Sequence, residues 1–131
     1  LKMEQAIRSL RRMLVSRHHV TTTAGYGPRY LHSTGQLHKG GPSSGVFLQL
    51  MDQMSPDMAI PGAAVTFGTL ARAQAAGDIQ ALQAHDRQAI VLPLGKNPIA
   101  TIQALTKSLA LRAPRGRSST TRTGTGRARK N

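Results

Sequence analysis

Glycine, proline, histidine, cationic and hydroxyl-bearing residues gather in one stretch, residues 25–42, which reads GYGPRYLHSTGQLHKGGP. Glycines let the backbone approach a ligand closely and prolines restrict the turns, so such a loop can bring side chains and N–H groups onto one small polar molecule. Its two histidines, His32 and His38, could transfer protons near neutral pH. A histidine that is hydrogen-bonded to hold the loop is the more common arrangement, so the residues alone leave both interpretations open.

The same stretch, followed by GVFLQ at residues 45–49, resembles the C-terminal sugar-isomerase (SIS) domain of glucose-6-phosphate isomerases. It is most similar to the isomerase half of bacterial bifunctional transaldolase/glucose-6-phosphate isomerases. A second block, TFGTLARAQAAGD at residues 66–78, resembles a segment of the same family in the same order, and the resemblance extends over residues 5–94. It implies the C-terminal part of an enzyme that interconverts glucose 6-phosphate and fructose 6-phosphate through an enediol, in glycolysis and gluconeogenesis.

The resemblance also implies roles for individual residues. His32 occupies the position of the histidine that assists opening of the sugar ring, typically in the site of a neighbouring subunit. We expect substrate contacts from Gln36, Lys39, Arg72 and Gln74. Lys39 could neutralise a substrate phosphate or lie at a solvated helix end, and Gln36 could bind a hydroxyl or hold the loop. Arg72 could instead be a surface arginine of a helix.

The chain departs from the family at three points. Ala71 stands where related sequences often have a lysine, which leaves that lysine's role unassigned. The only glutamate is Glu4, which does not match the family's catalytic base, and the loop rich in Ser and Thr that cradles the phosphate is missing. We therefore expect a partial domain that is inactive alone. It would be completed in a homodimer or by an N-terminal isomerase portion, and a transaldolase half could precede it.

Composition limits the alternatives. A chain of 131 residues suffices for one small domain, and the absence of cysteine removes disulfide and thiolate chemistry. There is no apolar run of about 20 residues, no signal-peptide pattern, and no spacing typical of metal ligands or of nucleotide-binding loops. We expect a soluble cytoplasmic protein without cofactor, metal or membrane partner.

The net charge of +13 is concentrated at the C-terminal end. Residues 111–131 contain seven cations, no carboxylate, and many Gly, Ser and Thr residues, which predicts a disordered tail after a domain at residues 1–110. A second hypothesis is therefore a nucleic-acid-binding or ribosome-associated protein that acts through this tail alone. A third is a non-catalytic module that binds sugar phosphates. The tail could also have no function.

The pattern of apolar residues predicts a layered α-β-α fold of the flavodoxin type with a mostly parallel sheet. The expected elements are a helix ending near His18 and His19, a strand at 20–24, a helix at 31–39, a strand at 45–50, a helix from Thr66 to Gly77, a helix capped by Asp78, a buried strand at 88–94, and a helix starting at Asn97-Pro98. The glycine-rich loop would then lie at the carboxyl ends of the strands. Because strands of the full sheet are missing, we expect an unpaired edge and hence aggregation or dependence on a partner.

Overall fold

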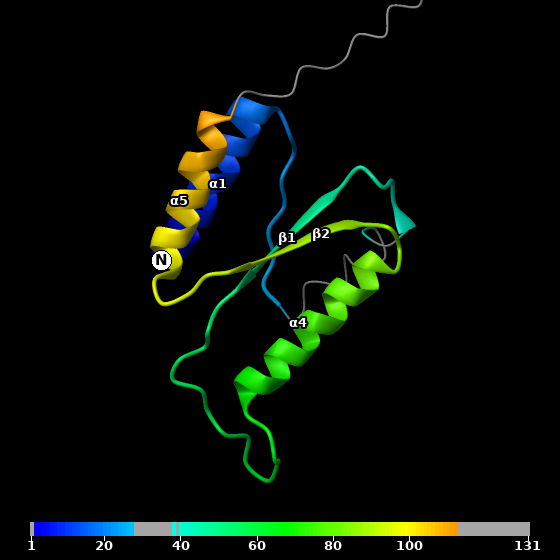
Figure 1. Ribbon diagram of the computed structural model, residues 1–131, viewed down its shortest axis with the longest axis vertical. Coiled ribbons are helices and arrows are strands. Elements are labelled where there is room, and N and C mark those ends of the chain that lie inside the picture. The colour runs from blue at the N-terminus through cyan, green and yellow to red at the C-terminus, as the bar shows by residue number, and fades with distance from the viewer. Residues whose placement is uncertain (1, 28–37, 39, 113–131) are drawn as a thin grey trace, which may run out of the picture.

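The computed structural model describes residues 2–27, 38 and 40–112 (Figure 1). Its elements, in chain order, are α1 (Lys2–His18), β1 (Val46–Met51), α4 (Phe67–Gln83), β2 (Gln88–Pro93) and α5 (Pro98–Leu111). The prediction of an α/β fold with a parallel sheet is confirmed. The helix predicted at 31–39 and the tail after residue 112 lie outside the described residues, apart from His38.

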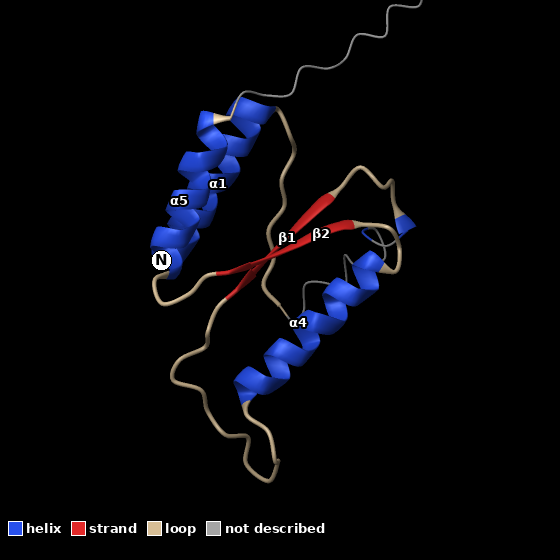
Figure 2. Cartoon of the chain, in the orientation of Figure 1, coloured by secondary structure: helices blue, strands red, loops and turns tan. Residues whose placement is uncertain are grey.

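The described sheet has two parallel strands, β1 and β2, in register from Val46 beside Gln88 to Met51 beside Pro93. The chain between them forms α4, so the three elements make one β-α-β unit. Gln49 in β1 donates from its Nε2 to the carbonyl oxygen of Ala75 in α4, at 3.1 Å. Figure 2 shows the strands between α4 on one side and the α1–α5 pair on the other.

The apolar core lies mainly between α1 and α5. Ala6 and Leu10 of α1 are buried together with Leu94 and Ile102, and the side chain of Ile102 is fully enclosed. The two helices run in the same direction (Figure 1), and His18 Nε2 lies 3.1 Å from the carbonyl oxygen of Leu109. Since a carbonyl only accepts, the imidazole N–H donates here and joins the C-terminal ends of both helices.

One face of the sheet is only partly covered. Side chains alternate along a strand, so Val46, Leu48 and Leu50 share this face with their neighbours Ile90 and Leu92. Leu50 and Leu92 pack on the cluster between α1 and α5, whereas Val46 and Ile90 are 61% and 55% exposed. The α1–α5 pair therefore covers only the carboxyl-terminal half of this face. The expectation that the whole second strand is buried is wrong.

The strand predicted at residues 20–24 does not form. Arg11 of α1 donates through Nε to Thr22 Oγ1 at 3.1 Å and through Nη2 to the carbonyl oxygen of Thr22 at 2.9 Å. A run of β-branched residues becomes a strand only when another strand pairs with it. Here an arginine side chain occupies the carbonyl that a strand would use, and Val20 stays 45% exposed.

The helix break predicted at Gly77 is also wrong. Thr66 caps α4 as expected, since its Oγ1 accepts from the N–H of Thr69 at 3.1 Å, but the helix continues through Gly77 and Asp78 to Gln83. A glycine inside a helix costs about 1 kcal/mol relative to alanine. Burial of Leu82, which is 2% exposed, offsets that cost, because packing of the last turns holds the helix together.

The start of α5 agrees with the sequence. Asn97 Oδ1 accepts from the N–H of Ala100 at 3.2 Å, and Pro98 occupies the first helical position. None of the described helices has the length and apolarity that a crossing of a bilayer requires.

Candidate functional site

Of the predicted site residues, His32, Gln36 and Lys39 lie outside the described residues. The C-terminal flank of their loop is described, and it lies at the amino ends of the strands. The His38 ring packs edge-on against Phe47, with ring centroids 5.2 Å apart. The carbonyl oxygen of Gly41 accepts from Arg87 Nη2 at 2.7 Å, and Arg87 directly precedes β2.

This placement changes the expected position of the loop. A strand at residues 20–24 leading into residue 25 would place the loop at the carboxyl ends of the strands, but that strand does not form. In the described part of the chain, the loop is followed by β1 and is not preceded by a strand. The carboxyl edge of the sheet is formed by other residues.

The two described site residues, Arg72 and Gln74, lie on α4. The guanidinium of Arg72 is 3.9 Å from the Asp57 carboxylate and donates to Thr69 Oγ1 at 3.2 Å. Gln74 is exposed to solvent. Arg72 is thus held at the start of the helix by an internal carboxylate, and its side chain is about half exposed.

Asp57 forms a network at the amino end of α4. Its Oδ1 accepts from the N–H of Gly68 and its Oδ2 from the hydroxyl of Thr66, both at 2.7 Å. The hydrogen bond from Thr66 lowers the pKa of the Asp57 carboxyl below its usual value, and the Gly68 N–H and the charge of Arg72 act in the same direction. Carboxylates are favoured at helix N-termini, so Asp57 occupies the place where a ligand anion would otherwise bind.

Gly68 is required by this arrangement. A Cβ on Gly68 would lie 2.5 Å from Asp57 Oδ2, which is closer than any real contact of that kind. Sequence reasoning missed both residues, although Ser55-Pro56-Asp57 carries the composition of a turn. This composition predicts a turn at residues 55–57, but it does not predict that the turn contacts the N-terminal end of α4.

A polar groove of about 500 Å³ lies at the carboxyl edge of the sheet. Its walls come from the loops that follow the two strands, residues 52–56 and residues 95, 96 and 98. Lys96 is the cation among these lining residues, and Asp52 is the carboxylate. Open α/β sheets bind ligands at this edge, so the groove can hold a small polar molecule. The turn composition of Gly95 to Pro98 after a predicted strand was the available sequence signal.

A second groove, of about 600 Å³, runs along α1 and is basic. It is lined by residues of α1 and by one residue of the following segment: Arg8, Arg11, Arg12, Val15, Ser16 and Thr22. It contains none of the predicted site residues. In the described part of the chain, no group of three His, Asp or Glu side chains lies close enough to hold a metal ion.

Comparisons with protein-family models, with curated proteins and with solved structures found no significant match to this chain.

Proposed function

We propose that this chain is the C-terminal part of a glucose-6-phosphate isomerase and supplies the ring-opening histidine of that enzyme. The observation that carries the proposal is the sequence of residues 25–42, together with the second block at residues 66–78. The second block begins at the N-cap of α4 and lies within the β-α-β unit. Units of this kind build the layered sugar-isomerase fold, which we propose as the finer fold class.

The proposed chemistry divides between this chain and residues elsewhere. His32 would give a proton to the ring oxygen and help remove one from O1, which opens the sugar ring. Gln36 and Lys39 would bind substrate hydroxyls and phosphate. The carboxylate that moves the proton between C2 and C1 would come from a partner subunit or from an N-terminal isomerase portion, because Glu4 is an exposed residue of α1.

Arg72 would bind substrate only if its guanidinium left the Asp57 carboxylate and bound the substrate phosphate instead. The ion pair with Asp57 is long and partly exposed, and such pairs contribute only about 0 to 1 kcal/mol. A dianionic phosphate could therefore replace Asp57 at the guanidinium. Gln74 lies two residues further along α4, on a different face of the helix from Arg72, and would contact substrate only in the completed site.

The test is an assay of glucose 6-phosphate and fructose 6-phosphate interconversion. We expect no activity from the chain alone, and activity after mixing with the N-terminal part of a related isomerase. His32→Ala should abolish the activity of the mixture, whereas His85→Ala, at the exposed end of α4, should leave it intact. Binding of glucose 6-phosphate without turnover in any mixture would favour a non-catalytic sugar-phosphate module. If the mixture shows no binding of glucose 6-phosphate and no activity, the isomerase proposal is overturned.

A further inference from the structure

We propose that a basic stripe on α1, formed by Arg8, Arg11 and Arg12, binds the phosphate backbone of a nucleic acid. This inference concerns a surface distinct from the proposed isomerase residues and does not depend on them. The proposed contact also differs from binding through residues 113–131, because it lies on α1.

The stripe faces away from the core. Residues at positions i, i+3 and i+4 of a helix lie on one face, so the three arginines are neighbours on the surface of α1. Ala6 and Leu10 lie on the opposite face and are buried against α5. Packing thus fixes the orientation of α1 and presents its arginines outward.

The groove beside the stripe is formed in advance. Arg11 bonds both the hydroxyl and the carbonyl oxygen of Thr22, which holds the segment after α1 alongside the helix. This leaves a shallow, open groove lined in part by Arg8 and Arg12, and most of its lining surface is apolar. Because Arg11 uses its Nε and Nη2 to bond Thr22, contacts with an anion fall mainly to Arg8 and Arg12.

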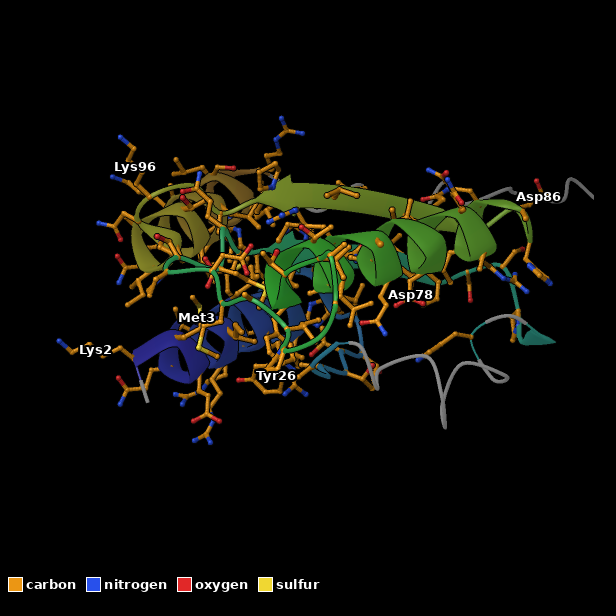
Figure 3. All side chains as sticks on the ribbon, turned by 90° about the horizontal axis from the view of Figure 1, so that it is seen from below. Lys2, Met3, Tyr26, Asp78, Asp86 and Lys96 are labelled. Carbon is orange, nitrogen blue, oxygen red and sulfur yellow. The ribbon has the colours of Figure 1, made fainter. Side chains whose placement is uncertain are left out.

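The carboxylate nearest to the stripe along α1 is Glu4, which precedes Arg8 by four residues and shares its face of the helix. In the described part of the chain, the ion pair is the one between Arg72 and Asp57, far along the sequence. Helix α1 carries five Lys and Arg residues and a single carboxylate, Glu4. Figure 3 shows Asp78 and Asp86 toward one end of the molecule and Lys2 toward the other. The three arginines outnumber the one carboxylate on their face, so the stripe keeps a net positive charge.

Other cations lie at the C-terminal ends of α1 and α5. The bond from His18 to the carbonyl of Leu109 brings the C-terminal ends of α1 and α5 together. Arg17 and Arg112 follow at these two ends. No acidic residue occurs in the sequence after Asp86. Arg17 is five residues after Arg12 and lies on another face of α1, so it does not lengthen the stripe along the helix.

These features favour a nucleic acid over other anionic partners. One guanidinium group can donate two parallel hydrogen bonds to a phosphate. A row of cations along a helix suits a polymer with regularly spaced negative charges. A membrane is disfavoured because the apolar face of α1 is buried against α5 and cannot enter the lipid. No aromatic side chain lines the groove, so bases would not stack there and binding should be independent of sequence.

The experiment uses the full chain and a short fluorescent DNA duplex of random sequence, with anisotropy measured over a range of salt concentrations. We expect R8Q/R12Q to weaken binding about tenfold at low salt and to reduce the slope of log K against log salt by about 2. K2Q/K107Q removes the same charge from two exposed lysines outside the groove and should leave the slope unchanged. R8K/R12K, which keeps the charge, should retain most of the slope.

Each alternative has a distinct outcome. Equal losses in R8Q/R12Q and K2Q/K107Q would show that only net charge matters and would overturn the proposal. Unchanged binding in R8Q/R12Q would place the contact elsewhere in the chain. Competition by polyglutamate or by anionic vesicles as strong as that by the duplex, and lost in the same variant, would assign the stripe to another class of partner. Circular dichroism of each variant checks that α1 remains folded.

Discussion

The α1–α5 pair and the β1–α4–β2 unit bury their apolar residues to different extents. Four buried apolar residues lie in the α1–α5 pair and directly after β2: Ala6, Leu10, Leu94 and Ile102. In the β-α-β unit, Leu82 is the buried large side chain, and Ile90 in the middle of β2 is 55% exposed. The comparison indicates that the helical pair supplies most of the packing free energy. The β-α-β unit depends more on backbone hydrogen bonds and on its helix caps.

The largest expected effect is that of Ile102→Ala. Removal of a fully enclosed isoleucine side chain leaves a cavity, so the free energy of unfolding should fall by about 2 to 5 kcal/mol. Ile90→Ala removes the same atoms from the exposed face of the sheet and should cost less than about 1 kcal/mol. Urea denaturation followed by circular dichroism measures both. Equal losses of stability in the two variants would contradict the difference in burial between the two regions, since they would mean that the face of β2 is covered in solution.

A smaller effect is expected at Gly68, which tests the cap of α4. In Gly68→Ala the new Cβ would displace the Asp57 carboxylate, and the free energy of unfolding should fall by about 1 to 2 kcal/mol. Gly77→Ala is the matched control, because a Cβ at Gly77 meets no atom within 4 Å. That change should stabilise the chain by about 0.5 to 1 kcal/mol. A loss of stability in Gly77→Ala would contradict a continuous α4.

The smallest effect is expected from pH, through Asp57. Its pKa is lower in the folded chain than in the unfolded chain, so its stabilisation is complete above the ordinary pKa of about 4 and disappears as pH falls through the lowered value. The stability difference between the unmodified chain and Asp57→Asn should therefore be largest above about pH 4 and should shrink in acid. Thermal melts over this pH range measure it. A difference that grows in acid would sink the assignment.

The elements that the sequence located correctly are those with strong local signals. Helix α1 follows from apolar residues at helical spacing, and the starts of α4 and α5 follow from Thr66 and from Asn97-Pro98. The parallel pairing of the two strands follows from the helix between them. Arg72 and Gln74 lie on α4 as expected, but their contacts with substrate stay a prediction, as do those of residues 32, 36 and 39.

The remaining features depend on contacts between distant parts of the chain. Residues 20–24 have the composition of a strand, and only the position of Arg11 shows that their backbone is used otherwise. Glycine is common at helix ends, so Gly77 predicts one, and only the burial of Leu82 shows that α4 continues. The Asp57 cap and the groove at the carboxyl edge both require knowing which loops meet. No local pattern contains that information.

The contact between the first and last described helices has a consequence for synthesis of the protein. His18 and Leu109 are 91 residues apart, and the apolar cluster joins the same two helices. At translation rates of about 5 to 20 residues per second, Ala6 and Leu10 would wait roughly 5 to 20 seconds for Ile102 to be made. During that interval the apolar face of α1 is uncovered on the nascent chain. Folding therefore cannot begin at this core, and the apolar face of α1 stays exposed until α5 emerges from the ribosome.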